Sequence, residues 1–369
     1  MSPVILSEDA ARRFVDGVCR AMGAPAEVAA EVAGHLVHAN LSGHDALGVV
    51  RLPEYVAEAD DGALVPGALP SVLRETAATA LIDADRGFGH HSTAFALAWC
   101  LERAASSGLA AAAVRHSTHV GRVGEYTERA AEAGMLAIVT VGAAGPGVGD
   151  VMLFGGRDRF FGANPWSVGV PGRTRSLTFD GPTSTMAESE VRLARAKRET
   201  LPPDCVYDRY GRPSTDPDDL FAGGGLVPLG GAVAGQRGAG LAFASALFGG
   251  LAMIGDERPS LVGAPVARPD ETGAGRIGGV FVQVVDPAAF GDAGAYRELV
   301  DGVLDAARSA RPAGGRSGVV LPGDAEARAR AERGRTGIRL SDATWADLCA
   351  VAERFGLPPP DRESGREGG

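Results

Sequence analysis

The chain has 369 residues, of which 45% are hydrophobic, and a formal charge of −10 at pH 7. This length fits about two domains, and no apolar run of about 18 residues is present, so we expect no membrane-spanning helix. The negative charge argues against a nucleic-acid-binding surface. The N-terminus does not resemble a secretory signal, and the four cysteines form no CxxC pair, so neither a zinc knuckle nor a disulfide framework is expected. We therefore predict a reduced, cytoplasmic protein.

Helices are predicted at both ends of the chain. Ser7 has the character of an N-cap, because acidic residues and then apolar residues at helical spacing follow it. A second helix is predicted over residues 26–40. Ser341 repeats the same start signal before a helix that Gly356 ends. The tail, residues 358–369, has almost no apolar content and is expected to be disordered.

Short strands and helices follow one another in the middle of the chain without regular βαβ units. This order favours an α+β fold over a doubly wound sheet. The apolar, Gly- and Ala-rich stretch 238–254 is predicted to be a buried helix in which small residues permit close packing. Strands are predicted at residues 78–83, 110–114, 135–142 and 280–285, and helices at 92–106, 124–133 and 293–309.

Two familiar patterns are rejected. Residues 273–278 match GxGxxG, but a loop precedes them and a strand follows, whereas dinucleotide binding needs a strand before and a helix after. His116 and His119 have a zinc-like spacing without a third ligand, so no metal site is predicted. The other close histidine pairs are expected to be structural: His35 with His38, facing solvent or a neighbouring helix, and His90 with His91.

The segment Asp45–Pro53 reads Asp-Ala-Leu-Gly-Val-Val-Arg-Leu-Pro. It resembles the signature Asp-Ser-His-Gly-Val-x-Arg-Leu-Pro of the type-2 malate/L-lactate dehydrogenase family. That family contains nicotinamide-dependent oxidoreductases of small 2-hydroxy and 2-oxo acids and related cyclic imino-acid reductases. The other residues of the signature, including Arg51, are found at the matching positions. The family's Ser-His pair, whose His is the expected proton donor, is replaced by Ala46-Leu47.

Further blocks resemble the family in the same order, and the resemblance covers about residues 5–356. It implies a non-Rossmann α+β fold with an NAD(P)-binding domain of residues 75–288. A helical domain for substrate binding and dimerisation would come from residues 1–74 and 289–357. The resemblance also implies a homodimer with the active site near the subunit interface. The blocks are residues 117–126, 161–166, 177–184, 208–217, 226–241 and 321–326.

The resemblance also implies which residues bind NADPH or NADH. His119 lies between a predicted strand and a helix, where a neutral imidazole can hydrogen-bond a carboxamide or an oxyanion, or transfer a proton. Arg51 would pair a substrate carboxylate, or form a structural ion pair with Asp45 or Glu54. The implied cofactor residues are His119, Gly121, Asn164, Asp180, Thr183, Ser184, Gln236, Arg237, Gly323 and Asp324, and Arg237, Arg173 or Arg175 would meet a 2′-phosphate.

Two further departures accompany the missing Ser-His pair. Glu190 stands where relatives usually carry Lys, and residues 232–235 are inserted before Arg237. Without the acid, no group donates a proton to the alkoxide that develops when a ketone is reduced, and this loss lowers the rate by a factor of about 10²–10⁴. Three explanations stay open. His119 or His44 donates the proton; the substrate is a protonated cyclic imine that accepts hydride directly; or the site has lost redox activity.

The predicted function is therefore an NAD(P)H-dependent reductase of a small carboxylated C=O or C=N substrate, a 2-oxo acid or a cyclic imino acid, in a specialised biosynthetic pathway. His119, Arg51 and His44 are the candidate catalytic residues. The alternative is a non-redox protein on the same scaffold, which binds a ligand or catalyses a different reaction.

Overall fold

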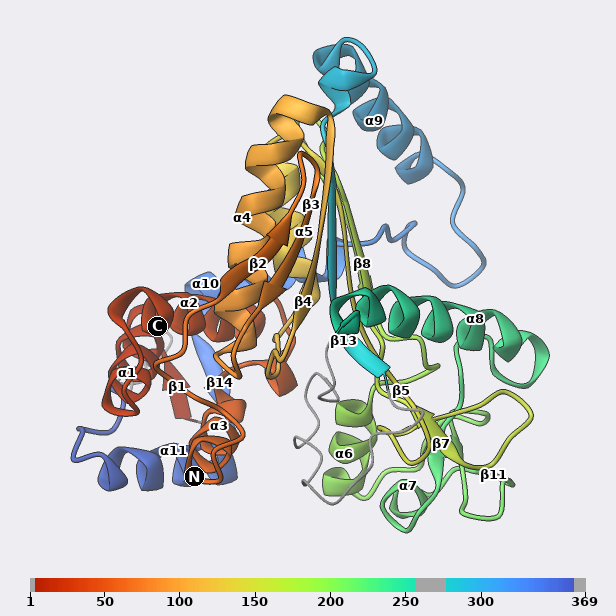
Figure 1. Ribbon diagram of the computed structural model, residues 1–369. Coiled ribbons are helices and arrows are strands. Elements are labelled where there is room, and N and C mark those ends of the chain that lie inside the picture. The colour runs from red at the N-terminus through yellow and green to blue at the C-terminus, as the bar shows by residue number, and fades with distance from the viewer. Residues whose placement is uncertain (1–3, 256–276, 362–369) are drawn as a thin grey trace, which may run out of the picture.

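The computed structural model describes residues 4–255 and 277–361. A helical bundle built from both chain ends lies beside a large mixed sheet, and a smaller lobe lies at one end of that sheet (Figure 1). This is the predicted α+β fold class. The rejected GxGxxG pattern lies outside the described residues except for Ile277 and Gly278, which begin a strand. Of the tail, residues 358–361 have no regular structure and the rest lies outside the described residues.

The helical bundle combines the two ends of the chain around one apolar core. Ser7 Oγ accepts the N–H of Ala10 at 3.1 Å, and Ser341 Oγ accepts the N–H of Thr344 at 3.1 Å, so both predicted N-caps are confirmed. The bundle contains α1 (Glu8–Ala21), α2 (Ala26–Leu41), α3 (Leu52–Asp60), α11 (Asp342–Arg354) and a small sheet of β1 (Val4–Leu6) with β14 (Ile338–Leu340).

The centre of the large sheet is formed by β5 (Leu136–Ala144) and β13 (Ile277–Val285), which are antiparallel from Leu136 opposite Val285 to Ala144 opposite Ile277. On the far side of β13 lies β4 (Leu109–Arg115), which is parallel to β3 (Thr79–Asp83). The helices α4 (Gly89–Ser107) and α5 (Val123–Glu132) cover one face of these strands. The helix α8 (Gly231–Gly249) lies against the other face (Figure 1).

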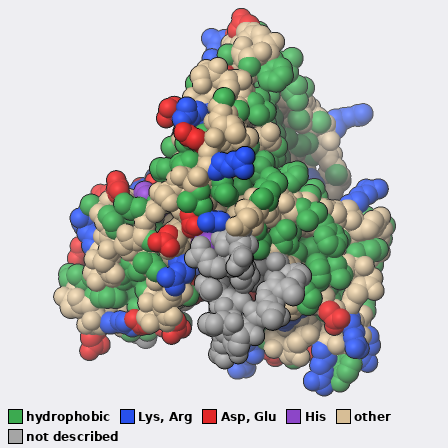
Figure 2. All heavy atoms as spheres, viewed as in Figure 1, with side chains coloured by type: hydrophobic (Ala, Val, Ile, Leu, Met, Phe, Trp, Pro, Cys, Tyr) green, Lys and Arg blue, Asp and Glu red, His purple; other side chains and the backbone are tan. Residues whose placement is uncertain are grey.

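Small residues let α8 approach the sheet closely, as predicted. A Cβ on Gly142 would lie 2.3 Å from the backbone of Ser245, and one on Gly249 would lie 2.4 Å from the carbonyl oxygen of Gly279. The prediction that this helix is buried throughout is wrong for the single chain. Its large apolar side chains remain partly exposed, although the ring of Phe243 packs on Phe161 and that of Phe248 on Phe281 of β13, and hydrophobic side chains gather over the helix in Figure 2. Those that are 41% to 58% exposed are Leu241, Phe243, Leu247, Phe248 and the following Leu251.

The buried apolar residues form three clusters, one in the helical bundle, one between the sheet and α4 and α5, and one in the lobe. The predicted two-domain division stays a prediction. Among the described residues, no helix has the length and apolarity needed to cross a bilayer. The remaining elements are β2 (Ser71–Glu75), β6 (Val151–Met152), β7 (Arg159–Phe161), β8 (Trp166–Val170), β9 (Leu177–Gly181), α6 (Glu188–Lys197), β10 (Val206–Tyr207), β11 (Pro213–Ser214), α7 (Asp218–Phe221), β12 (Gly225–Leu226), α9 (Ala293–Arg308) and α10 (Asp324–Thr336).

Candidate active site

The segment Asp45–Arg51 joins α2 to α3 and is held in place by Asn40. The Asn40 Nδ2 donates to Asp45 Oδ1 at 2.7 Å, and its Oδ1 accepts the N–H of Val49 at 2.9 Å. A Cβ on Gly48 would lie 2.2 Å from Asn40 Oδ1, so only glycine fits there. The frame of the signature therefore has a structural reason: it fixes the backbone that precedes Arg51.

Arg51 is already paired within the chain. Its Nε donates to the carbonyl oxygen of Ala46 at 2.8 Å, and its Nη1 lies 2.5 Å from Glu54 Oε2. This is one of the two structural ion pairs considered above. The other is absent, because Asp45 Oδ1 lies 2.6 Å from Arg333 Nη1 of α10 instead. A substrate carboxylate would share the Arg51 guanidinium with Glu54, whose own side chain is half exposed.

His119 lies beside Arg51 and is bonded to Tyr55 of α3. The Tyr55 Oη is 2.7 Å from His119 Nδ1, and Tyr55 is buried. Burial, together with the nearby positive charge of Arg51, lowers the pKa of His119 to about 3. The imidazole is therefore neutral at physiological pH, although His119 itself is partly exposed. Ala46 and Leu47, at the position of the family's acid, carry no titratable group.

Two further histidines pack behind His119. His90 and His35 are fully buried, and their rings meet edge to face with centroids 4.9 Å apart. Burial lowers the pKa of His35 to about 4 and that of His90 well below its ordinary value. Gly121 lies against both: a Cβ there would come within 2.4 Å of His35 Nε2 and 2.8 Å of the His90 ring. Of the two alternatives expected for His35, solvent or a neighbouring helix, the second is found, because His35 faces α5.

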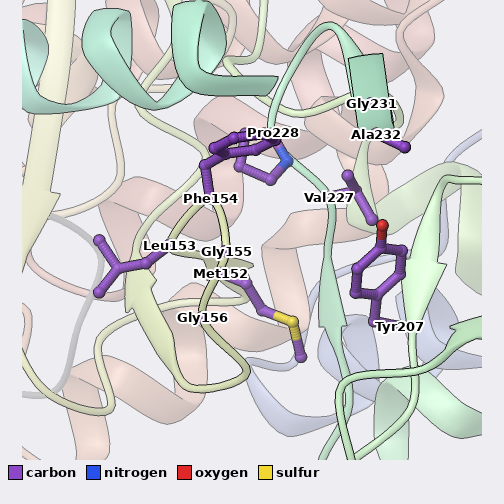
Figure 3. A pocket seen from close by; sticks show the side chains of 10 residues that line it. All are labelled: Met152, Leu153, Phe154, Gly155, Gly156, Tyr207, Val227, Pro228, Gly231 and Ala232. Atoms are coloured by element: carbon purple, nitrogen blue, oxygen red, sulfur yellow. The ribbon is translucent and has the colours of Figure 1, made fainter. Parts of the chain in front are cut away.

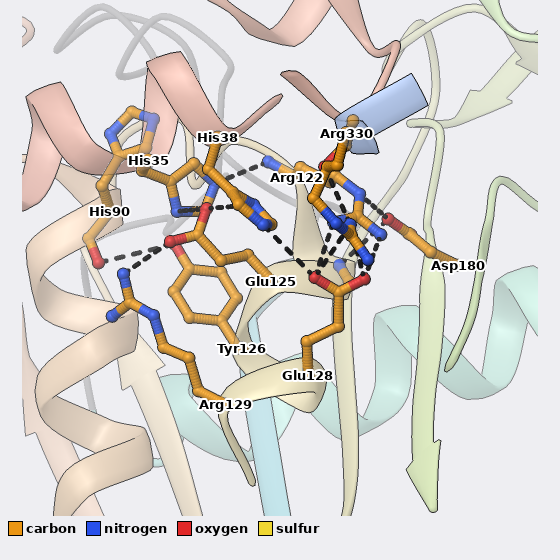
Figure 4. A network of polar contacts seen from close by, with 12 residues as sticks. His35, His38, His90, Arg122, Glu125, Tyr126, Glu128, Arg129, Asp180 and Arg330 are labelled. Carbon is orange, nitrogen blue, oxygen red and sulfur yellow. Dashed lines mark hydrogen bonds and ion pairs between the residues drawn. The ribbon is translucent and has the colours of Figure 1, made fainter. Parts of the chain in front are cut away.

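A network of paired charges begins one residue after Gly121 (Figure 4). The Arg122 guanidinium, whose side chain is 1% exposed, binds both carboxylate oxygens of Glu128 at 3.0 and 3.1 Å. Its Nε lies 3.3 Å from Asp180 Oδ2 of β9, and Asp180 also accepts the N–H of Gly124 at 3.0 Å. Arg330 of α10 reaches Glu128 from the other side at 3.3 Å. These contacts join α5 to β9 and to α10.

The second half of the network surrounds Glu125 of α5. Its Oε2 lies 3.1 Å from His35 Nδ1 and 3.3 Å from His38 Nδ1, while Arg129 binds its other oxygen at 2.5 Å. Burial opposes ionisation here, but His35, His38 and Arg129 hold the pKa of Glu125 well below its usual range. Glu125 is thus a buried carboxylate that faces Arg129 and two histidines.

Glu31, His35 and Glu125 also bring three potential metal ligands within 4.8 Å of one another. The backbone N–H of Arg122 donates to His35 Nε2 at 2.8 Å, which places the imidazole proton on Nδ1, the atom that faces Glu125. Arg129 Nη1 lies 2.7 Å from the Glu31 carboxylate. Each potential ligand therefore already has a partner in the chain: His35 and Glu125 face each other, and Glu31 is paired with Arg129. Of the rejected zinc pair, His116 binds Asp83 at 3.0 Å and His119 binds Tyr55.

His44 belongs to the charged network rather than to the Arg51 group. Its Nε2 lies 3.2 Å from Glu326 Oε1 of α10. The hydrogen bond from His44 outweighs burial and lowers the pKa of Glu326 to about 2. His44 also acts on Asp180, whose pKa is raised by burial and partly restored by Arg122. No described contact joins His44 to His119, so the two proposed donors lie in different groups.

Most of the predicted cofactor residues use their polar atoms on their own chain. Asn164, at φ 42°, accepts the N–H of Ala143 at 3.0 Å and donates to Ala242 O at 2.9 Å, which ties β5 to α8. The Thr183 hydroxyl donates to Ala163 O at 3.1 Å, and the Ser184 hydroxyl donates to Met186 O at 2.7 Å. Asp324 accepts from the Leu321 N–H at 2.9 Å and from Arg308 at 2.6 Å, while Gly323 is the left-handed residue before α10.

Gln236 and Arg237 differ from these residues because both are exposed on α8. Neither forms a side-chain hydrogen bond or ion pair with any part of the chain that the structure describes. The inserted residues 232–235 form the first turn of α8, which is kinked at Ala234. Arg173, by contrast, is paired with Glu298 at 2.6 Å. Arg237 is therefore the better placed of these two arginines to meet an anion.

A cavity of about 220 Å³ lies where β6 meets the start of α8 (Figure 3). Its lining is apolar apart from the hydroxyl of Tyr207, and it includes part of the inserted turn. The cavity contains no charged side chain and none of the three candidate catalytic residues. It does not match the chemistry of a phosphate or carboxylate site. Its walls are Met152, Leu153, Phe154, Gly155, Gly156, Tyr207, Val227, Pro228, Gly231 and Ala232.

Comparison with known proteins decides the family. The family model described as malate/L-lactate dehydrogenase matches residues 6–349. The chain belongs to the malate/L-lactate dehydrogenase family. It is 32% identical to hydroxycarboxylate dehydrogenase B of Escherichia coli (strain K12), over 94% of this chain and 92% of that protein. It is also 32% identical to Delta(1)-pyrroline-2-carboxylate reductase of Ancylobacter novellus, over 90% of this chain and 93% of the reductase.

Solved structures of the malate/L-lactate dehydrogenase family have the same fold. Sulfolactate dehydrogenase from Methanocaldococcus jannaschii matches with a TM-score of 0.84 at 27% identity, covering 97% of this chain and 99% of that one. The delta1-piperideine-2-carboxylate reductase from Pseudomonas syringae pvar. tomato matches with a TM-score of 0.77 at 26% identity, covering 95% and 99%. The predicted family, fold and enzyme class, an oxidoreductase, are confirmed. Membership implies a nicotinamide cofactor and a small carboxylated substrate.

In this member of the malate/L-lactate dehydrogenase family, sequence reasoning missed the residues that surround His119. Tyr55 lies four residues after Arg51, the N-cap of α3, a helical spacing that could have indicated a shared site. Nothing local indicated that His90 would pack beside it. Arg122 was visible inside the predicted segment 117–126, but its burial and its carboxylate partners are tertiary.

Proposed function

We propose that this chain is an NAD(P)H-dependent reductase of a small carboxylated C=O or C=N substrate, and that a protonated C=N is favoured. One observation carries the preference. No group that is protonated at neutral pH stands at the family's acid position, Ala46-Leu47, and the imidazole beside Arg51, His119, is neutral. Reducing a ketone needs a hydride and a proton, whereas a protonated imine needs only the hydride.

The charges around Arg51 support a cationic substrate. Glu54 already pairs with Arg51, and Glu188 of α6 acts on the same guanidinium. Burial opposes the charge of Arg51, but these carboxylates raise its pKa, so a cation is retained. A substrate that carries both a carboxylate and an iminium nitrogen would find Arg51 for the first and Glu54 or Glu188 for the second. The neutral His119 adds no repulsion.

The described residues fit a nicotinamide cofactor at two places. His119 offers Nε2, which no other described group bonds, at the junction between β4 and α5. Arg237 offers an exposed guanidinium that lacks an ion-pair partner among the described residues and would meet a phosphate. The nicotinamide, when bound, supplies the hydride. His119 would orient it, and Arg51 would hold the substrate carboxylate.

A paired substrate panel tests the proposal. The loss of absorbance of NADH and of NADPH is followed with five- and six-membered cyclic imino acids and with the open-chain 2-oxo acids of the same carbon count. We expect kcat/KM to be at least about tenfold higher for the cyclic imines. Faster turnover of the 2-oxo acids would overturn the preference for C=N. No turnover of any member, despite nucleotide binding, would count against a reductase.

A non-redox role on the same scaffold is the second candidate, because the side chains of Asn164, Thr183 and Ser184 hydrogen-bond backbone carbonyl oxygens instead of pointing their polar atoms at a cofactor site. Calorimetric titration with NADH and NADPH separates the two. Micromolar binding of either nucleotide supports the reductase. Absence of binding of both supports the second candidate.

We also propose that the chain forms a homodimer in the cytoplasm and that the exposed apolar side of α8 is covered in it. Leu247 is 58% exposed and Leu251 is 47% exposed, and apolar area of this kind is costly to leave in water. Multi-angle light scattering of the purified chain should give twice the 37.7 kDa mass of the monomer. A monomer that persists at high protein concentration would contradict the dimer.

A further inference from the structure

The hydroxyl of Tyr55 lies between two imidazoles and has a single proton to give. Its Oη is 2.7 Å from His119 Nδ1 and 3.4 Å from His90 Nε2. A phenol donates one hydrogen bond and accepts others. Tyr55 therefore donates to one of these rings and accepts from the other. The direction of these two hydrogen bonds decides which nitrogen of His119 carries its proton.

The surroundings of His90 settle the direction. His90 is fully buried, and its Nδ1 has no hydrogen-bond partner among the described residues. A proton on Nδ1 would be a buried N–H with no acceptor, whereas a proton on Nε2 points at the Tyr55 oxygen. Buried N–H groups without a partner are rarer and less tolerated than buried acceptors without one. The favoured order is His90 Nε2–H to Tyr55 Oη, and Tyr55 O–H to His119 Nδ1.

We propose that Tyr55 is a positioning residue that fixes His119 as the Nε2–H tautomer, so that His119 presents an N–H donor to the reacting centre. The catalytic part of this inference rests on the proposed function. With Nδ1 accepting from Tyr55, the single proton of the neutral ring lies on Nε2, the nitrogen that faces away from Tyr55. Arg51, which acts on the same ring, disfavours a second proton.

The fixed tautomer defines what His119 does. An Nε2–H donates a hydrogen bond to a carboxamide or carboxylate oxygen, and it holds the bound partner in one orientation. His119 is then a hydrogen-bond donor rather than a source of a net proton. This agrees with a substrate whose nitrogen is already protonated. The opposite tautomer would offer a lone pair and would select a different face of a carboxamide.

Nitrogen NMR of the wild-type chain tests the tautomer without any substrate. The seven histidines are labelled with ¹⁵N, and the His119 ring is assigned by its absence from the His119→Gln variant. We expect Nδ1 of His119 to have the shift of an unprotonated ring nitrogen and Nε2 that of a protonated one. The reverse pattern, or an even mixture of the two, would overturn the inference.

The variants Tyr55→Phe and Tyr126→Phe provide a matched pair. Tyr126 is equally buried, but its hydroxyl bonds the backbone oxygens of Val120 at 2.6 Å and His90 at 3.4 Å, and among the described residues no hydrogen bond joins it to an imidazole nitrogen. Tyr55→Phe should move both His119 ring nitrogens towards averaged shifts, and Tyr126→Phe should leave them in place. Unchanged His119 shifts in a folded Tyr55→Phe protein would also overturn the inference.

Kinetics add the catalytic consequence. Tyr55→Phe should lower kcat by about tenfold or more while the Kd of the reduced nicotinamide changes by less than about threefold, and Tyr126→Phe should leave kcat within about threefold. Equal losses in both variants would show that Tyr55 is merely structural. If the wild-type chain turns over no substrate, the proposed function fails, and the NMR result still decides the tautomer.

Discussion

Two neighbouring groups of polar residues lie on either side of Gly121, and they differ in charge. The His119 group, with Tyr55 and His90, is neutral, and burial keeps its imidazoles unprotonated. The charged network around Arg122 and Glu125, with Glu128, Arg129 and Asp180, is built from ion pairs, and it joins α2, α5, β9 and α10. The charges hold the parts of the molecule together, whereas in the neutral group no described residue bonds Nε2 of His119.

Removing one charge from the network should have the largest effect on stability. Arg122→Met removes the cation beside Asp180 and leaves Glu128 with Arg330, and breaking a buried pair costs about 3–5 kcal/mol. Denaturant unfolding of both proteins measures the difference. Arg173→Met is the control, because its pair with Glu298 is exposed and should cost about 0–1 kcal/mol. Equal losses in the two variants would contradict the division of roles.

Gly121 is the point where the two groups meet, so a methyl group there should disturb both. Its φ is +72°, and a Cβ would collide with His35 and His90. The left-handed conformation and the collision together should cost about 2–4 kcal/mol in Gly121→Ala. Gly62→Ala has the same φ of +72° with nothing within 4 Å and should cost only about 1 kcal/mol. The difference in the free energy of unfolding between the two variants isolates the packing against the histidines.

Mild acid should affect the neutral group before the charged one. The pKa of His119 is lowered from 6.5 to about 3 in the folded chain, so the unfolded chain binds the proton first and stability falls as pH drops below 6.5. Glu125 stays ionised in this range because its pKa is held far below 4.5. The difference in the free energy of unfolding between wild type and His119→Gln should shrink by up to about 2 kcal/mol between pH 7 and 5. Solvent screening makes the change smaller than this upper value.

Thermal unfolding of both proteins at pH 7, 6 and 5 measures this change, since Gln binds no proton at that position. An advantage that is constant over the range would show that the His119 pKa is not lowered. An advantage that grows in acid would show that the ring is protonated in the folded chain, and it would restore His119 as a proton donor.

Local signals in the sequence were sufficient for elements but not for the contacts between them. Ser7 and Ser341 were recognisable as N-caps because the hydroxyl and its N–H partner lie three residues apart. The Tyr55–His119 bond joins positions 64 residues apart, and no periodicity reports it. The apolar pattern of α8 predicts burial, but a sequence does not say whether an apolar face is covered by its own chain or by another copy.

Glu190 gives the smallest effect and bears on whether its departure from the family pattern is functional. Its Oε2 accepts the N–H of Ala187 at 2.8 Å, which satisfies a donor at the start of α6 and places a negative charge at the positive end of that helix. Glu190→Lys loses both effects and should cost about 1 kcal/mol in the free energy of unfolding. Glu190→Gln keeps the hydrogen bond and should cost less.

Because Glu190 is exposed and bonded to its own helix, neither variant should change the Kd of the nicotinamide by more than about twofold. A clear gain in affinity in Glu190→Lys would instead mean that the charge at position 190 reaches the cofactor, and that this chain departs from the family at the nucleotide as well as at the missing acid.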